Sequence, residues 1–455
     1  MSVQMKAGFA RVNITPEFSV PLGGYGDEER RMSQVNLDPL YATCVAISDG
    51  ENKILFYHLD LTGCKSEVAN YCKAEIEKAH GIPQQNIFFT ATHTHSAPAL
   101  SCEVDSIKKY IEQVLQPGIL AAAGPALEDL EEAELYVGSG ETDGLNFVRR
   151  YLLSDGTYGG DNFGDFKKND ILGHETKADP TMQVVRWKRK TKKDILMVNW
   201  QAHPHRTGGF RKFELSSDVI EHFRLNVEKS AKYLFAFYQG CAGNLNTHSR
   251  LAAENTYRTP GYYEDGNKAY KAHGACLAAT CFDIVENKMR PVKAGKIHTV
   301  EKVFEGPVNH TWDHKVDDAR RVRELWNAGK SDEARALALE LGFNSVYHCT
   351  AVINRSTMPE TFSYKIYAAC MGDFAFSATP NEPYDTTGIY LKNSSPFEMT
   401  FVCGYTNAHG CGYMPTTKAF AHGGYGCDTC RFPSGTAEKL ADEMLGLLFQ
   451  LYAEK

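Results

Sequence analysis

Two pairs of histidines share the same spacing and the same surroundings in the sequence. His93 and His95 follow the apolar run 87–89 in the segment TATHTHSAPA, and His203 and His205 follow a second apolar run in NWQAHPHRTGG. Side chains two residues apart in an extended segment point to the same side, so each pair can direct two imidazoles, common ligands of zinc, towards one point. A single pair is equally well explained by a turn cap and a hydrogen-bonded buried histidine. Two such pairs at strand ends favour a metal site.

A carboxylate or another oxygen donor is expected to complete this site, because catalytic zinc usually has three protein ligands and leaves one position for water. Glu382, in FSATPNEPYD, follows an apolar strand-like run at 374–377 and a turn that contains proline. Periodicity does not separate it from the other acidic residues. Glu382 is therefore a candidate chosen by its position at a strand end.

Strands and helices alternate around these residues. A strand at 54–60, a helix at 66–80 ended by Gly81, and a strand at 87–91 form one strand–helix–strand unit, for which parallel pairing is expected. The same order recurs further along the chain, in segments at 194–205, 217–230 and 233–244. The sequence predicts an α/β fold with mixed sheets flanked by helices, and α/β enzymes keep their chemistry in loops at strand ends.

The chain shows no internal repeat, low-complexity tract or proline-rich linker, so a single domain over residues 1–455 is expected. A helix at 105–127 is expected to be interrupted by Pro117. A charged segment without proline, at about 314–342, predicts a helical insertion, and an amphipathic helix at 434–454 closes the chain.

The composition excludes several classes of protein. With a net charge of -7, 43% hydrophobic residues and 23% charged residues, the 455-residue chain matches an ordinary soluble globular protein and not a disordered one. The negative charge argues against binding to nucleic acid or to an anionic membrane. The one basic run, KRKTKK at 188–193, lies between two strand-like segments and is expected to form a hairpin turn.

The N-terminus lacks a basic start followed by a long apolar stretch, and no window of the sequence is long enough to span a membrane. We therefore expect a cytoplasmic protein without a transmembrane segment. The 13 cysteines, an odd number spread over the chain, do not indicate a disulfide framework. Cys427 and Cys430 form the one close pair, for which reduced thiols are favoured over a structural or redox role.

Eight short motifs occur in the order seen in the neutral/alkaline, non-lysosomal ceramidase family, and the chain resembles a divergent member of that family from about residue 7 to residue 440. Each motif is short, but an ordered series is hard to obtain by chance. The motifs are ITP (14–16), PLGGYG (21–26), THTHSAP (92–98), NWQAHPH (199–205), SSD (216–218), QGCAGNLN (239–246), TPNEP (379–383) and GYMPT (412–416).

The resemblance implies a zinc amidase site. The zinc ligands that it implies are, in this sequence, His93, His203, Glu382 and Tyr413. His95 matches a histidine placed for proton transfer beside the metal, and Tyr425, in GGYGC, matches a tyrosine that contacts the scissile amide. Arg149 or Arg150, in NFVRRY, corresponds to an arginine near the substrate oxygen. Because tyrosine is an unusual zinc ligand, a buried core tyrosine with a hydrogen-bonded hydroxyl is an equal alternative for Tyr413.

The loop GNLN departs from the family pattern. Characterised ceramidases carry an aspartate and a serine where this chain has Asn244 and Asn246. Asn246 can donate a hydrogen bond to an oxyanion but cannot act as a nucleophile, and the alternative for the loop is a glycine-rich turn that only reverses the chain. Asp60 and Asp218 match family positions near the pocket, where either would orient a metal-binding histidine, although a helix N-cap explains Asp218 as simply.

These residues indicate a zinc-dependent hydrolase of a carboxamide (N-acyl) bond that uses metal-bound hydroxide. Zinc lowers the pKa of bound water to about 7, His95 would transfer the proton, and Tyr425, Asn246 and Arg149 would stabilise the oxyanion.

The expected substrate is a small-molecule or lipid-like N-acyl compound. From the short segment after the closing helix and the first residues of the sequence, we expect neither the C-terminal immunoglobulin-like domain of the lipid-processing enzymes nor a secretion signal. Both expectations weaken an assignment to ceramide. The alternatives are a metal-dependent esterase or phosphoester hydrolase on the same site, or an inactive binding protein that retains the metal.

Overall fold

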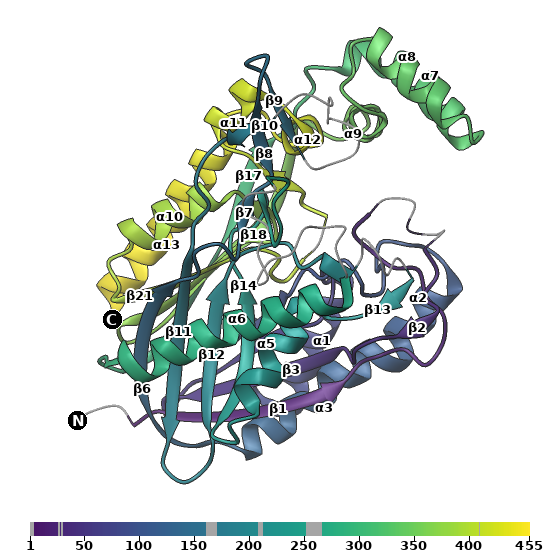
Figure 1. Cartoon of the computed structure of the whole chain (residues 1–455). Helices are drawn as coiled ribbons and strands as arrows, with labels where there is room; N and C mark the ends of the chain where they lie inside the picture. The colour runs from purple at the N-terminus through teal and green to yellow at the C-terminus, as the bar shows by residue number, and fades with distance from the viewer. Residues whose placement is uncertain are drawn as a thin grey trace.

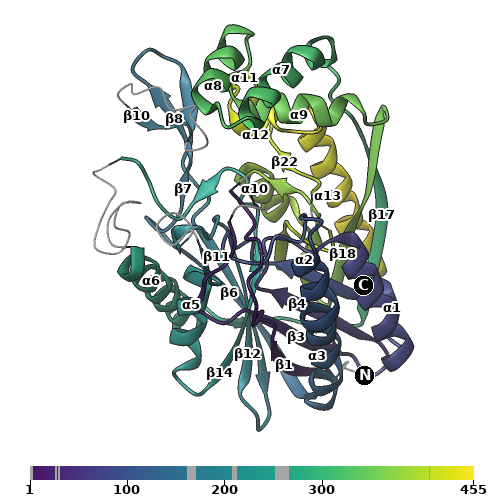
Figure 2. The ribbon, with the colours of Figure 1, turned by 90° about the vertical axis from the view of Figure 1, so that its right-hand side faces the viewer.

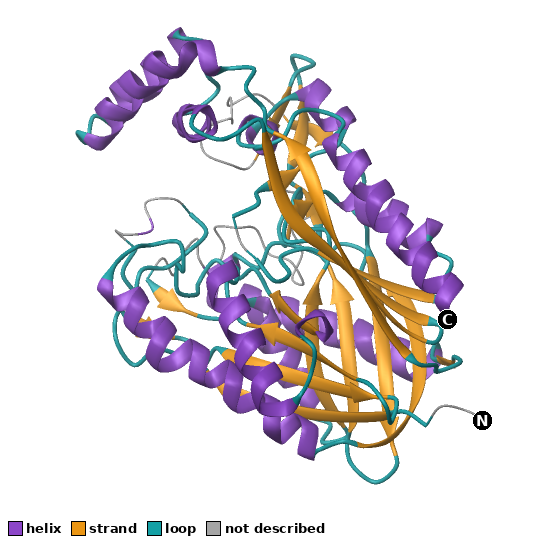
Figure 3. Cartoon of the chain, turned by 180° about the vertical axis from the view of Figure 1, so that it is seen from behind, coloured by secondary structure: helices purple, strands orange, loops and turns teal. Residues whose placement is uncertain are grey.

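Two mixed sheets pack face to face between layers of helices (Figures 1 and 3). A computed structural model describes residues 4–25, 28, 31–160, 171–207, 213–251, 266–408 and 410–455. The strands of the larger sheet follow the order β14 (Tyr233–Gln239), β12 (Asp194–Trp200), β11 (Thr181–Arg189), β6 (Glu131–Glu141), β1 (Lys6–Asn13), β3 (Tyr41–Ser48), β4 (Lys53–Leu59) and β5 (Ile87–Ala91). The smaller sheet has the order β17 (Ile297–Pro307), β18 (Thr361–Met371), β19 (Phe374–Ala378) and β21 (Met399–Cys403).

Parallel pairing occurs where the sequence predicts strand–helix–strand units. Helix α1 (Ser66–His80) connects β4 to β5, and these two strands are parallel. Helix α5 (Val219–Glu228) connects β12 to β14 in the same way. The run 188–193 closes the antiparallel hairpin of β11 and β12. The predicted α/β class with mixed sheets is therefore confirmed.

Helices cover the outer face of each sheet. On the larger sheet, α1 and α3 (Gln116–Glu128) pack over β1, β3 and β4, whereas α5 and α6 (Gly266–Asn287) pack over β11, β12 and β14 (Figure 2). On the smaller sheet the covering helices are α10 (Asp385–Ser394) and α13 (Thr436–Glu454). Helix α13 begins two residues after the predicted start at 434.

Both faces of the central strands are buried, because each sheet lies between helices and the other sheet. In β12, Leu196 and Val198 face α5 and α6, whereas Ile195 and Met197 face the smaller sheet. Successive side chains of a strand point to opposite faces, so a strand buried on both sides is apolar throughout. This burial explains the uninterrupted apolar runs that precede the paired histidines.

Three helices lie between β17 and β18, namely α7 (Val316–Asn327), α8 (Ser331–Glu340) and α9 (Val346–Ser356). They bury a small apolar cluster of their own that includes Val322, Ala338 and Cys349. In Figure 1, α7 and α8 project away from the sheets.

The helix expected at 105–127 continues through Pro117. It consists of α2 (Asp105–Tyr110), a π-helical turn at Ile111–Leu115, and α3, in whose first turn Pro117 lies. The π-helical turn, in which the Gln116 amide donates to the Ile111 carbonyl, shifts the hydrogen-bond pattern just before Pro117, which has no amide hydrogen to donate.

Short elements complete the fold. They are β2 (Val35–Asn36), β7 (Phe147–Val148), β8 (Arg150–Leu153), β9 (Tyr158–Gly160), β10 (Ile171–His174), β13 (Glu214–Leu215), β15 (Leu245–Asn246), β16 (Arg290–Pro291), β20 (Glu382–Pro383), β22 (Tyr413–Met414), α11 (Thr417–His422) and α12 (Tyr425–Asp428). Cys427 and Cys430 are buried and carry free thiols. Within the described ranges, the helices are too short or too polar to cross a bilayer.

Candidate metal centre

The paired histidines and Glu382 come from loops at the carboxyl ends of parallel strands. His93 and His95 follow β5, His203 and His205 follow β12, and Glu382 lies in β20, shortly after β19. Each of these three strands has a parallel partner in its sheet. Carboxyl ends of parallel strands meet at one edge of a sheet, which brings segments distant in sequence together.

His93, His203 and Glu382 converge on one point. The Glu382 Oε2 atom lies 3.5 Å from His93 Nε2 and 3.4 Å from His203 Nε2. The histidines are 3% and 0% exposed. His93 has a φ of 63°, a left-handed conformation that costs a non-glycine residue about 1–3 kcal/mol. A strained backbone at this position is consistent with a functional constraint on the direction of the ring.

The other ring nitrogen of each histidine fixes its tautomer. His93 Nδ1 lies 2.7 Å from the Thr62 carbonyl oxygen, and His203 Nδ1 lies 2.8 Å from that of Ala242 and 3.0 Å from that of Leu245. A carbonyl can only accept, so Nδ1 carries the hydrogen and Nε2 presents a lone pair. Metal-binding histidines show this arrangement, in which a carbonyl orients the ring and raises its basicity as a ligand.

Two acceptor atoms in this cluster lack a donor. His203 Nε2 and Glu382 Oε2 are buried and have no hydrogen-bond partner in the described part of the chain. Burial, followed by the positive charge of Arg149, holds the pKa of His203 well below its usual value, so the ring is neutral. Acceptors that face one another in a buried site are satisfied by a cation, and the donor set of imidazole and carboxylate suits zinc.

His95 is the third imidazole of the cluster. Ligand nitrogens of His93, His95 and His203 all lie within 4.8 Å of one another, and His95 Nε2 is 3.2 Å from His93 Nε2. Burial and then the neighbouring His93 hold the pKa of His95 well below its usual value. Gly24 lies against the His95 ring and has a φ of 101°, a conformation that favours glycine. A β-carbon at this position would lie 2.3 Å from the Cγ atom of His95. Gly24, the second glycine of PLGGYG, therefore makes room for His95.

Tyr413 joins the cluster through strand pairing and through Arg149. Strands β20 and β22 are parallel, in a register that places Tyr413 opposite Glu382. Arg149 Nη2 donates hydrogen bonds to the Tyr413 hydroxyl, at 3.0 Å, and to the Gly243 carbonyl, at 2.7 Å. Burial, followed by the negative charge of Glu382, raises the pKa of Tyr413 to about 12, so its phenol is protonated in the absence of a metal ion.

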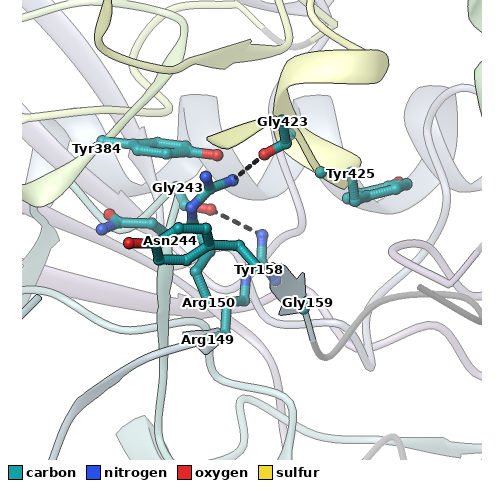
Figure 4. A pocket seen from close by; sticks show the side chains of 12 residues that line it. Arg149, Arg150, Tyr158, Gly159, Gly243, Asn244, Tyr384, Gly423 and Tyr425 are labelled. Carbon is teal, nitrogen blue, oxygen red and sulfur yellow. Dashed lines mark hydrogen bonds between the residues drawn. The ribbon is translucent and has the colours of Figure 1, made fainter. Parts of the chain in front are cut away.

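Figure 4 shows that the two candidate arginines have different partners. Arg149 reaches Gly243 beside the candidate metal centre, whereas Arg150 donates to the carbonyl oxygens of Gly423 and Ala419 and forms an ion pair with Glu175. Arg149 is thus the arginine that contacts the centre. Arg150 holds the glycine turn that precedes α12.

Tyr425 begins α12 and lines the same cavity as Arg149 (Figure 4). Its ring lies 5.7 Å from the ring of Tyr413 and 6.2 Å from that of Tyr347, which belongs to α9. Burial, and then the neighbouring Tyr413, raise the pKa of Tyr425 well above its usual value. A protonated phenol in this position can donate a hydrogen bond to a bound group.

The two asparagines of GNLN have separate roles. Asn244 exchanges two hydrogen bonds with Asp385, donating to its carboxylate at 2.8 Å and accepting from its amide at 2.9 Å. Its side chain therefore ties the loop to α10. Asn246 pairs by a backbone bridge with His203, and its Oδ1 lies 2.8 Å from His205 Nε2. Because an amide oxygen accepts, His205 donates and fixes the orientation of the Asn246 amide.

Asp60 and Asp218 contact neither His93 nor His203 by hydrogen bonds within the described ranges. Asp60 binds His58, at 3.0 Å, and the backbone amide of Tyr41. Asp218 accepts from the Val219 amide, as the N-cap of α5, and from Thr207. Of the two interpretations of Asp218, the N-cap is the one that these contacts support.

Tyr405 is a residue of the centre that sequence reasoning missed. Its ring stacks on His93 with the centroids 4.2 Å apart and an angle of 29° between planes. The residue is 1% exposed, and its hydroxyl has no hydrogen-bond partner among the residues described. Tyr405 follows the apolar strand β21, the same setting as the paired histidines, so its position at a strand end was the available signal.

No protein-family model and no curated protein matches the sequence. Two solved structures share its fold. One is the neutral ceramidase from Pseudomonas aeruginosa, with a TM-score of 0.72 and 16% identity over 98% of this chain and 74% of that chain. The other, described as "Ceramidase complexed with C2", has a TM-score of 0.72 and 16% identity over 100% of this chain and 76% of that chain. The fold is therefore ceramidase-like.

Proposed function

We propose that the chain is a zinc-dependent hydrolase of carboxamide bonds and a divergent member of the neutral/alkaline ceramidase family. The observation that carries this proposal is that His93 Nε2 and His203 Nε2 both lie within 3.5 Å of Glu382 Oε2 in a buried site. The ordered sequence motifs and the ceramidase-like fold support it. The proposed substrate is a small-molecule or lipid-like N-acyl compound.

His93, His203 and Glu382 would hold the ion, with Tyr413 as the fourth ligand. A zinc ion bound there would supply Lewis acidity and lower the pKa of bound water. In the metal-free arrangement, His95 Nε2 donates to the His93 Nε2 lone pair, 3.2 Å away. If a cation took that lone pair, the His95 imidazole would lose this hydrogen-bond acceptor and would be available to hold or release a proton at Nε2. We assign to His95 the transfer of that proton to the departing amine.

The donors around the centre suit the negative charge that develops on a carbonyl oxygen during hydrolysis. Arg149 is buried and charged, because Tyr413 and Glu382 outweigh the cost of its burial and raise its pKa. Tyr425 is a protonated phenol in the same cavity. We assign oxyanion stabilisation to these two residues and to the Asn246 amide, which His205 orients.

The test is a panel of N-acyl amides, esters and phosphoesters, assayed with the full chain before and after chelation and after zinc is restored. We expect turnover of amides that chelation abolishes and zinc restores. His203→Ala is expected to lose both zinc and activity, whereas His314→Ala, an exposed histidine outside the cluster, keeps both. Turnover that resists chelation, or zinc content unchanged in His203→Ala, would overturn the proposal. Turnover of esters or phosphoesters alone would replace the amide assignment.

A further inference from the structure

A second cavity, of about 790 Å³, opens between α1 and β18. Figure 2 shows α1 next to β17 and β18. None of the candidate metal ligands or their histidine neighbours lines this cavity. Its walls include Lys73 and Glu77 of α1, Glu301 of β17, Tyr364 and Tyr367 of β18, Asn407 after β21, and Arg431 after α12. Its volume is in the range of small-molecule sites.

Three polar atoms of these lining residues are buried without a hydrogen-bond partner in the described part of the chain: the Tyr364 hydroxyl, Asn407 Nδ2 and Arg431 Nη1. Asn381 lies near Tyr364, and Tyr367 lies near Asn407, but neither pair meets hydrogen-bond geometry. Buried polar groups in native proteins nearly always have a partner, so three in one wall call for an explanation.

The unpartnered atoms are hydrogen-bond donors. The Phe89 amide donates to Asn407 Oδ1 at 2.9 Å, which fixes the orientation of the side chain and leaves its NH₂ group towards the other side. Arg431 donates through Nη2 to the Gly410 carbonyl at 2.8 Å and covers the Phe362 ring at 4.0 Å, so its position is also fixed. An arginine can only donate, and a phenol donates readily.

Lys73 adds a positive charge that forms no ion pair in the described part of the chain. The residue is 6% exposed, and its Nζ lies 5.2 Å from the centre of the Tyr367 ring. Within the described ranges, no carboxylate lies within ion-pair distance of it, and the nearby Glu301 is paired with Lys365. Burial lowers the pKa of Lys73 to about 8. Glu301 attracts Lys73 over a longer distance, but a buried ammonium without an ion-pair partner is still costly, and a bound anion would offset this cost.

We propose that this cavity binds a small anion through a carboxylate or phosphate group. Lys73 and Arg431 supply the charge, and Asn407 and Tyr364 supply further hydrogen bonds. Oxygen atoms of such a group accept from ammonium, guanidinium, amide and phenol donors alike. The aromatic ring of Tyr367, beside Lys73, offers a surface for an organic part of the ligand. The site requires no metal and does not depend on the proposed hydrolase activity.

The test measures binding of inorganic phosphate and of benzoate to the zinc-loaded full chain by isothermal titration calorimetry at low salt. Lys73→Met and Arg431→Gln are expected to weaken binding of the preferred probe at least about tenfold each, because each removes a charge-assisted hydrogen bond to the anion. Lys78→Met, which removes an exposed charge from the same helix, and Arg321→Gln are the matched controls and should bind as the wild type does.

Lys73→Met keeps the proposal testable if Arg431→Gln fails to fold, because Lys73 makes no hydrogen bond within the described ranges that the substitution would remove. If the wild type binds only one of the two probes, and Lys73→Met weakens that binding, the result supports the site and identifies its ligand class. Absence of binding by both probes would overturn the proposal. Binding that persists in Lys73→Met would place the anion elsewhere and would also overturn it.

Discussion

Replacing Glu382 by glutamine separates the roles of this side chain with and without a metal ion. In the metal-free protein, Glu382 Oε2 faces the lone pair of His203 Nε2 at 3.4 Å, and neither atom has a donor. Glutamine has nearly the same shape, and its NH₂ group can donate to His203. Because an unsatisfied buried acceptor costs about 1–3 kcal/mol, we expect the metal-free Glu382→Gln protein to be more stable than the wild type by about that amount.

With zinc present, the order should reverse. An ion at about a thousand times its dissociation constant stabilises the folded state by about 4 kcal/mol, and Glu382→Gln lacks the charged ligand needed for this gain. The assay is urea unfolding of both proteins, in excess chelator and in excess zinc. Glu340→Gln, at an exposed position of α8, is the control and should follow the wild type in both conditions. The reasoning would be refuted if metal-free Glu382→Gln were no more stable than the metal-free wild type and if zinc stabilised both proteins equally.

Three further predictions concern residues around the centre. Burial raises the folded-state pKa of Asp385 from 3.8 to about 6, so its contribution to stability is fully present below pH 3.8 and lost as the pH rises through about 6. At about 1.4 kcal/mol per unit, Asp385→Asn should remove about 3 kcal/mol of pH dependence from urea unfolding between these limits, and an unchanged slope would contradict this. His205→Phe keeps the ring but not the N–H that orients Asn246, and should lower kcat/KM about five- to tenfold at unchanged zinc content; unchanged kcat/KM would remove this role. Arg149→Lys should lower kcat about 100-fold with zinc retained, whereas loss of zinc would assign Arg149 to the structure of the metal site instead.

Local patterns in the sequence were sufficient for the elements that position the centre. Helix 66–80 and strand 87–91 were predicted to the residue, because an amphipathic period, a left-handed Gly81 and a short apolar run are all local features. The parallel pairing of β4 with β5 followed from the helix between them. The expectation that Pro117 interrupts the helix at 105–127 was wrong, because the first turn of α3, which follows the π-helical turn, accommodates this proline.

The assignment of the metal ligands stays a prediction, but their proximity is a property of the tertiary structure. Two strand-end histidine pairs pointed to a site, and the sequence offered no means of selecting Glu382 beyond its position after a strand. Its convergence with His93 follows from packing the smaller sheet on the larger one. Likewise, only the fold distinguishes Arg149, which contacts Tyr413, from Arg150, which binds Glu175.

The sequence by itself determined the strands and helices next to the paired histidines and which of those strands end in imidazoles, because periodicity and turn chemistry act over a few residues. The tertiary structure decided which loop ends meet, that His205 holds Asn246, and that unpartnered donors of four separate elements line one cavity. These contacts join residues tens to hundreds of positions apart, and packing of sheets and helices, not local propensity, sets the distances between them.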